Sequence, residues 1–327
     1  MKKNILIIIC IIVIITPIYA LKNKSKIVST SSFDYINDIK KYYNPSYNTE
    51  YITDINTIKL NSDKIKNKYQ FVIASDLHAS IRDDLEKDEK IRQALLERND
   101  MFTQQHPNKI DSQQVFEEII NFTNNKNADA LLLAGDIIDS PSDSNFRFLR
   151  ENLKKINSQY LYTLGNHDWS FAWDYHTKNA QEKYFPKFNE FMNDIQVSYL
   201  EYEDLIVLAI NDSKDLIEDA AIDKIKQVLE KKKPTIVMLH VPLATEYIAK
   251  KAIEIRNRVS AIGEHGIKPT ESTKKAIDLI LSENYNVFHV ISGHVHFEIE
   301  DELKKNITQT VSAPAYAGNL SVIEINN

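Results

Sequence analysis

Five short segments of the sequence combine histidine, aspartate and asparagine in spacings that suit metal binding. They are Asp76-Leu77-His78, Gly135-Asp136, Gly165-Asn166-His167-Asp168, His240 and Gly293-His294-Val295-His296. Five of the nine histidines of the chain lie in these segments. Imidazole together with carboxylate oxygen suits Mn²⁺, Fe²⁺, Zn²⁺ or Co²⁺ better than Ca²⁺. The set therefore indicates a site for divalent cations of that kind.

The spacing within two segments predicts that their side chains converge. Asp76 and His78 are two residues apart, as are His294 and His296, and alternate side chains of an extended backbone point to the same side. A carboxylate such as Asp136 could bridge two cations about 3.5–4 Å apart, as in two-metal hydrolases. A single histidine at a strand end is more simply structural, and an aspartate there can cap a helix. The combination favours a metal site.

Each segment follows an apolar run that is typical of a buried strand. The runs are 70–75, 130–134, 160–164, 235–239 and 287–291, with a further one at 205–210. Short, continuously apolar runs predict strands that are buried on both faces. Helical patterns lie between them, at 113–125, 146–156, 180–193, 215–231 and 272–282. The alternation predicts a layered α/β fold, in which ligands bind outside the carboxyl ends of strands.

Three further strands are expected at the ends of the domain. Residues 51–60 are expected to pair with the strand that follows them, and 308–312 and 320–325 to close the fold as antiparallel strands. Only six glycines occur in the chain, and three of them lie in the polar segments. We expect these three glycines to form tight turns that let the backbone approach a ligand.

A long charged segment, 80–110, interrupts the alternation. It predicts an inserted helix beside the end of the first strand of the repeated pattern. A solvated helical face is the simpler interpretation, and a lid or substrate-recognition element is the alternative. Substrate determinants are expected in this insert and in 244–273. Candidate contacts are Tyr247, His265, Trp169 and Trp173, where each tryptophan could stack on a base or sugar or could cover the core.

Length and charge restrict the class of protein. The chain has 327 residues and a formal net charge of -6, which suits one large or two small domains. An acidic chain without a long basic stripe argues against nucleic-acid binding. The charge does not exclude a small anionic substrate, because a bound metal dominates the local field.

The N-terminus predicts an export signal. Lys2 and Lys3 precede an unbroken apolar run at 5–15, and the small residue Ala20 follows. This pattern in residues 1–20 is typical of a secretory signal. An uncleaved anchor is the alternative, so the protein is expected to be secreted or held at the cell surface.

The rest of the chain then divides into a linker and one domain. Residues 21–50 are expected to be the linker and 51–327 the domain, and membrane contact is expected only through residues 1–21. The only cysteine, Cys10, lies in the signal segment. A cleaved chain would have no thiolate nucleophile, cysteine-bound metal or disulfide.

The polar segments together resemble the calcineurin-like metallophosphoesterase family. The matching motifs are DLH (76–78), GDIID (135–139), GNHD (165–168), LHVP (239–242) and GHVH (293–296). The resemblance implies a four-layer α/β/β/α sandwich, with two mixed β-sheets flanked by helices. This is the metallo-dependent phosphatase fold.

The resemblance also implies a role for each site residue. One cation would be bound by Asp76, His78 and His296, the second by Asn166, His240 and His294, and Asp136 would bridge them. His167 would lie near the phosphate without being a ligand, and Asp168 would orient His167 or a ligand, with a similar supporting role for Asp139. Purple acid phosphatases carry tyrosine where this chain has Asp139, so a ferric–tyrosinate site is not expected.

The activity that follows is hydrolysis of small phosphomonoesters or phosphodiesters by an exported enzyme. Two divalent cations (Mn²⁺, Fe²⁺, Zn²⁺ or Co²⁺) would hold a bridging hydroxide that attacks phosphorus in line, with His167 as the acid. Two alternatives stay open. One is a non-catalytic binding or scaffold protein, which usually lacks some ligands. The other is a nuclease of the same fold, which would prefer a basic groove.

Overall fold

The computed structural model describes residues 51–326. The expected signal or anchor at 1–20 and the expected linker at 21–50 lie outside the described residues. Among the residues described, none of the helices combines the length and the apolar character needed to cross a membrane.

The first sheet has five strands in the order β1-β11-β2-β3-β4. Their bounds are Asp54–Leu60 (β1), Tyr69–Ala74 (β2), Ala130–Ala134 (β3), Gln159–Thr163 (β4) and Asn319–Ile325 (β11). Strands β2, β3 and β4 run parallel, whereas β11 is antiparallel to β2 and parallel to β1. All five residues of β3 are buried, as its uninterrupted apolar run predicted.

The second sheet has six strands in the order β5-β6-β7-β8-β10-β9. Their bounds are Val197–Glu201 (β5), Ile206–Ile210 (β6), Thr235–Met238 (β7), Val287–Ser292 (β8), Ile299–Lys304 (β9) and Ile307–Val311 (β10). The four inner strands are parallel, and the edge strands β5 and β9 are antiparallel to their neighbours. Both sheets are therefore mixed.

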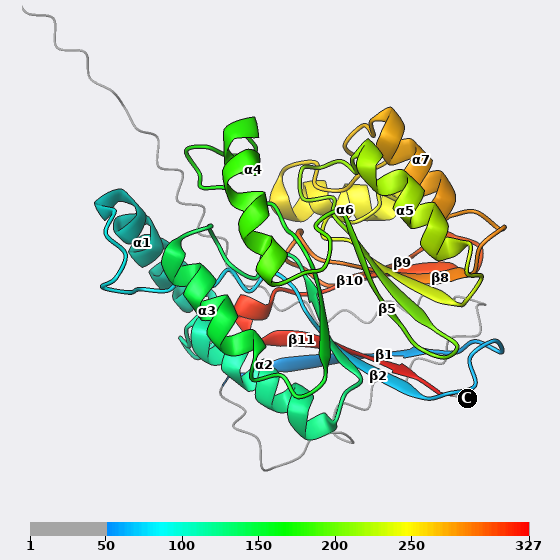
Figure 1. The fold of residues 1–327 in the computed structure, drawn as a ribbon, viewed down its shortest axis with the longest axis horizontal. Coiled ribbons are helices and arrows are strands. Elements are labelled where there is room, and N and C mark those ends of the chain that lie inside the picture. The colour runs from blue at the N-terminus through cyan, green and yellow to red at the C-terminus, as the bar shows by residue number, and fades with distance from the viewer. Residues whose placement is uncertain (1–50, 327) are drawn as a thin grey trace, which may run out of the picture. The chain divides into compact units, whose positions relative to one another are not determined.

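Helices cover the outer face of each sheet (Figure 1). Helices α2 (Ser112–Lys126), α3 (Asp143–Leu153) and α4 (Lys178–Tyr184) pack on the first sheet, and α5 (Asp219–Leu229) and α7 (Glu271–Ile280) on the second. Between the sheets, the ring centroid of Phe71 in β2 lies 5.7 Å from that of Tyr202. The Thr163 hydroxyl of β4 donates a 2.9 Å hydrogen bond to the Ile210 carbonyl of β6. The α/β/β/α sandwich implied by the family resemblance is confirmed.

Two helices lie outside this simple layering. Helix α1 (Glu89–Gln105) is the helix of the inserted segment, and the Asp88 side chain caps it by accepting the N–H groups of Lys90 and Ile91. Helix α6 (Glu246–Arg256) follows β7 and packs through Ala252 against the loop and strand after β8.

The structure corrects three sequence expectations about the elements. Strand β11 lies between β1 and β2, so the expected pairing of 51–60 with the next strand is wrong. Strands β10 and β11 are each antiparallel to only one of their two neighbours. The helix expected at 180–193 ends at Tyr184 and continues as a 3₁₀ helix, Phe185–Glu190, because Pro186 has no N–H to donate.

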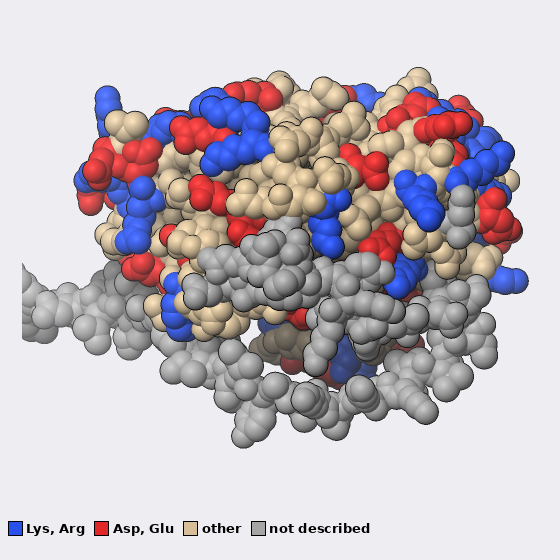
Figure 2. Space-filling model, turned by 90° about the horizontal axis from the view of Figure 1, so that it is seen from below, with Lys and Arg blue, Asp and Glu red and all other residues tan. Residues whose placement is uncertain are grey.

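Charged side chains of both signs are mixed over the surface. Figure 2 shows Lys and Arg interspersed with Asp and Glu on the described part of the visible face, without a continuous basic region. This distribution agrees with the acidic net charge.

Candidate metal centre

Most of the predicted ligands lie on loops that begin where strands end. Asp76 and His78 follow β2, Asp136 follows β3, and His294 and His296 follow β8. All five have positive φ angles, between 49° and 70°. Left-handed backbone costs about 1–2 kcal/mol per residue and needs support from its surroundings. The extended backbone expected for the pairs Asp76/His78 and His294/His296 is therefore wrong. The side chains of Asp76 and His78 do converge, whereas His294 and His296 lie in different clusters of possible metal ligands.

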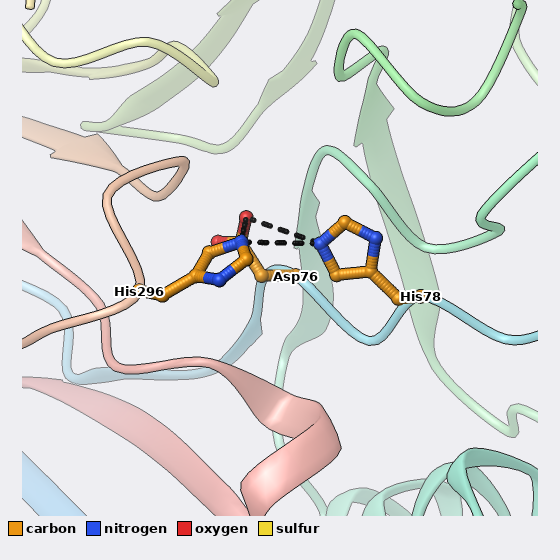
Figure 3. A group of neighbouring side chains, drawn as sticks. All are labelled: Asp76, His78 and His296. Carbon is orange, nitrogen blue, oxygen red and sulfur yellow. Dashed lines mark hydrogen bonds and ion pairs between the residues drawn. The ribbon is translucent and has the colours of Figure 1, made fainter. Parts of the chain in front are cut away.

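Asp76, His78 and His296 form the first cluster (Figure 3). His296 Nε2 lies 3.2 Å from Asp76 Oδ1 and 3.1 Å from His78 Nε2. Asp76 is fully buried, and its Oδ1 has no hydrogen-bond partner among the described residues. A buried carboxylate oxygen without a partner is unfavourable unless a cation compensates its charge. The cluster therefore fits a metal site.

The second cluster is built around His240, which follows β7. Its Nε2 lies 3.3 Å from Asp136 Oδ2, 3.2 Å from Asn166 Oδ1 and 3.3 Å from His294 Nδ1. Ligand atoms bound at about 2.1 Å to one cation lie roughly 3.0–3.4 Å apart in octahedral or tetrahedral geometry. The three distances from His240 Nε2 fall in this range.

Asp136 joins the two clusters. Its Oδ2 is 3.3 Å from His240 Nε2 and 3.7 Å from His78 Nε2. Its other oxygen accepts the backbone N–H of His167 at 2.7 Å, which fixes the carboxylate. All seven residues expected to be ligands thus meet at one place, with Asp136 between the two groups.

Partners on the far side of the imidazole rings select the nitrogen that faces the centre. His78 Nδ1 lies 2.8 Å from Asp139 Oδ1, and His240 Nδ1 lies 2.9 Å from the Ala134 carbonyl. A ring that donates from Nδ1 presents the lone pair of Nε2. For both rings, Nε2 is the nitrogen inside the cluster, as a metal ligand requires.

Burial and neighbouring charges set the charge state of the centre. Burial raises the pKa of Asp136, but the charges of His240 and His167 outweigh it and hold this pKa well below its ordinary range. Burial lowers the pKa of His240, but Asp136 outweighs it and raises this pKa to about 10. Burial lowers the pKa of the other three imidazoles of the clusters, which are therefore neutral. A cation beside Asp136 would replace the proton on His240.

His167 contacts a carboxylate, but that carboxylate is not Asp168. His167 Nδ1 lies 3.1 Å from Asp139 Oδ1, and its side chain is about one-third exposed. Asp168 is fully buried and accepts hydrogen bonds from the Tyr162 hydroxyl and from backbone N–H groups that include that of Asp136, at 2.9 Å. Of the two roles expected for Asp168, these contacts agree with orienting a ligand and not with orienting His167.

All three glycines in the polar segments leave room for site side chains, and a Cβ on Gly165 would lie 2.2 Å from Asp136 Oδ1. A Cβ on Gly135 would lie 2.3 Å from His240 Nδ1, and one on Gly293 would lie 1.7 Å from Ser75 Oγ. The close approach expected at these glycines is present, and it admits side chains of the chain itself.

Helix α1 contacts the centre directly. Arg98 donates from Nε and Nη2 to the two oxygens of Asp139, at 2.5 and 2.6 Å. The Phe102 ring stacks on the ring of His78, with centroids 4.5 Å apart and an interplanar angle of 17°. The insert is therefore more than a solvated face. The sequence analysis missed both residues, and their i, i+4 spacing in a charged helix is the only signal for them.

Two of the candidate substrate contacts have different surroundings. Trp169 is fully buried and its Nε1 donates to Ser213 Oγ at 3.0 Å, so it covers the core and cannot stack on a substrate. Trp173 is 44% exposed. The sequence analysis did not single out Tyr175, whose side chain is 48% exposed. The part of this side chain that is buried, together with Asp215 and Asp136, raises its pKa.

Two mixed sheets between helices, with a carboxylate shared by two clusters of metal-ligand side chains, define a protein of the metal-dependent phosphoesterase class. The model of one family, described as calcineurin-like phosphoesterase, matches residues 69–298. The chain belongs to the calcineurin-like phosphoesterase family.

Several solved structures are similar at low sequence identity. A dimetal phosphatase from Danio rerio is 10% identical, with a TM-score of 0.47 over 76% of this chain and 88% of that chain. A purple acid phosphatase from yellow lupin (Lupinus luteus) is 13% identical, with a TM-score of 0.49 over 78% of this chain and 45% of that chain. A putative 5'-nucleotidase from Staphylococcus aureus is 12% identical, with a TM-score of 0.40 over 76% and 49%. Comparison with curated proteins gives no match.

Proposed function

We propose that the chain hydrolyses small phosphomonoesters or phosphodiesters with two divalent cations (Mn²⁺, Fe²⁺, Zn²⁺ or Co²⁺). The observation that carries the proposal is the position of Asp136 Oδ2, 3.3 Å from a nitrogen of one cluster and 3.7 Å from a nitrogen of the other. Asp76, His78 and His296 would hold one cation, and Asn166, His240 and His294 the other.

Two divalent cations held by these residues would supply Lewis-acid chemistry, which would activate water at neutral pH and polarise the phosphoryl oxygens. The side chains of the protein would orient the metal ligands and protonate the leaving oxygen. His167 is held at Nδ1 by Asp139, so Nε2 is the nitrogen left to give a proton to the leaving oxygen. Asp168 holds the backbone of the Asp136 loop.

The surface supports a small substrate over a polymer. The net charge is -6, and the described part of the face shown in Figure 2 has no continuous basic region. A nucleic-acid backbone would require such a region. The phosphate of a small ester needs only the local positive charge of the cations.

The test is hydrolysis of p-nitrophenyl phosphate and of bis(p-nitrophenyl) phosphate. We expect activity with added Mn²⁺, loss after exhaustive chelation, and return when Mn²⁺ or another of the four cations is restored. The Asp136→Asn variant should lose bound metal and activity together. Full activity of the chelated protein, or wild-type activity of Asp136→Asn, would contradict the proposal.

Export is a separate proposal that rests on the pattern of residues 1–20. Expression of the full chain should deliver the activity outside the cytoplasm, either free or with the membrane fraction. A variant without residues 1–20 should stay in the cytoplasm. Equal distribution of the two chains would contradict the proposal.

A further inference from the structure

Exposed apolar side chains are concentrated in three segments of the chain. Nine large hydrophobic side chains are exposed in the part of the chain that the structure describes. Eight of the nine lie in 80–110, 169–177 and 244–273, which together make up about a quarter of the described residues. An even distribution would place about two of nine there. We call these eight the apolar rim: Leu85, Met101, Trp173, Tyr175, Tyr247, Ile253, Ile255 and Val259.

The first two of these segments adjoin the metal centre. The segment 80–110 includes α1, and Arg98 of that helix contacts both Asp139 and, through Nη1, the sulfur of Met101 at 3.8 Å. The segment 169–177 follows His167 and Asp168 directly in the chain. Lys90 of α1 joins the two segments, because its Nζ lies 3.9 Å from the ring centroid of Trp173.

The third segment brings two arginines to the centre. Arg256 is the last residue of α6 and lies one turn beyond Ala252, which packs against Val295 between two ligand histidines. Burial and the nearby Arg258 lower the pKa of Arg256, whereas Tyr316, Asp76 and Asp136 act in the opposite direction.

Neither arginine has a carboxylate within ion-pair distance among the residues described. Arg258 donates from Nε to Ser260 Oγ at 3.2 Å, and Arg256 is partly buried. Arg256 is partly buried beside the exposed Arg258, and an anion bound to both would offset the repulsion between the two positive charges. Their position beside the metal centre therefore favours an anionic ligand.

We infer that the substrate is an amphiphilic phosphate ester, whose phosphate binds the metal centre and the two arginines and whose hydrocarbon chain lies on the apolar rim. The inference rests on the proposed phosphoesterase activity. Water would supply the oxygen that bonds to phosphorus, the ester P–O bond would break, and the leaving oxygen would take a proton. The products are a phosphate and an apolar alcohol.

The apolar rim and the two arginines together favour a substrate with a hydrocarbon chain over a protein partner or a second copy of this protein. A single exposed apolar side chain is ordinary, but Met101, Trp173 and Tyr175 lie in the two segments that adjoin the metal centre, and grouped exposed apolar side chains indicate a binding surface. Arg256 and Arg258, which could bind a phosphate headgroup, lie in the third of the same segments. One ligand with an anionic end and an apolar end satisfies both features.

The experiment measures release of inorganic phosphate from n-alkyl phosphates of increasing chain length, each kept below the concentration at which it forms micelles. Burial of each methylene can raise kcat/KM by up to about fourfold. We expect a rise of at least about tenfold from butyl to octyl phosphate. In Tyr175→Ser and Met101→Ser the rise should shrink severalfold. Tyr199→Ser is the matched control, because Tyr199 is 39% exposed and lies in β5, outside the three segments.

Each other outcome would overturn the inference. A flat chain-length series in the wild-type protein, or an equal loss in Tyr199→Ser, removes the role of the rim. Sedimentation with anionic vesicles, or dimerisation that the rim variants abolish, combined with a flat series, assigns the rim to a membrane or to a second copy. Failure to hydrolyse p-nitrophenyl phosphate as well would overturn the proposed function itself.

Discussion

Asp139 is the residue at which the interactions around the metal centre meet. Its Oδ1 lies 2.8 Å from His78 Nδ1, 3.1 Å from His167 Nδ1 and 2.6 Å from Arg98 Nη2. A single buried carboxylate thus orients one candidate ligand and the candidate acid, and the arginine of the insert holds that carboxylate. The bidentate, charge-assisted contact of Arg98 with Asp139 fixes the position of this carboxylate.

Replacing His167 should separate metal binding from turnover. His167→Ala is expected to keep both cations, because His167 is not a predicted ligand, and to lose about 10²–10⁴-fold in kcat. Metal analysis of the purified variant, beside its rate with p-nitrophenyl phosphate, checks this. A variant that loses its metal would show that His167 is a ligand.

Arg98→Ala should reduce kcat by about 10–100-fold, because partners of ligand side chains have effects of that size. Arg98→Lys should restore part of the rate, and KM should change less than kcat. The matched control is Arg92→Ala in the same helix, since the exposed Glu89 is the only ion-pair partner of Arg92 within residues 51–326. Equal rates in the two alanine variants would contradict a positioning role for Arg98.

At the scale of the elements, the strand ends were predictable and the strand neighbours were not. Continuous apolar runs followed by polar residues located β2, β3, β7 and β8 to within one residue. Strand β9 escaped prediction because its sequence, IEDELK, carries four charges on an exposed edge. The position of β11 between β1 and β2 depends on contacts between residues far apart in the chain, which no local pattern contains.

Local sequence patterns also predicted only part of the candidate site. The seven candidate ligands follow strands and could be found from residue type and spacing. Arg98 and Phe102 lie in an insert whose charged pattern is that of any solvated helix. Their role depends on where α1 docks, and docking is a property of the folded molecule.

Gly293→Ala tests how closely the loops approach one another. The added Cβ would lie 1.7 Å from Ser75 Oγ and 2.5 Å from Asp76 Oδ2, so the loop that carries His294 must move. We expect loss of bound metal and a lower melting temperature. Metal content and thermal unfolding measure both, and wild-type metal content would contradict the close approach.

At the scale of the whole molecule, a buried histidine in strand β8 of the second sheet makes the free energy of unfolding depend on pH. His289 in β8 is fully buried, its Nδ1 lies 2.8 Å from Thr308 Oγ1, and its Nε2 has no hydrogen-bond partner among the described residues. Burial lowers its pKa to about 3. An unfolded histidine has a pKa near 6.5. Between these values the unfolded chain binds a proton that the folded chain does not.

The free energy of unfolding should therefore fall as the pH decreases from about 6.5 toward 3. One proton contributes up to about 1.4 kcal/mol per pH unit in that window. Urea unfolding of His289→Asn and of the wild-type protein at several pH values gives the difference, which should shrink as the pH falls. His265→Asn, at an exposed histidine, is the control and should keep the wild-type slope. Parallel slopes for all three proteins would contradict the assignment.

The contact of α1 with both His78 and Asp139 makes cation uptake and helix docking a single linked equilibrium. A cation that orders the His78 ring must favour the docked state of the helix. By the same free energy, undocking of the helix must weaken binding of the cation. Amide hydrogens of α1 should therefore exchange with solvent more slowly when Mn²⁺ is present. The exchange rate of this helix would then report how much metal the protein holds.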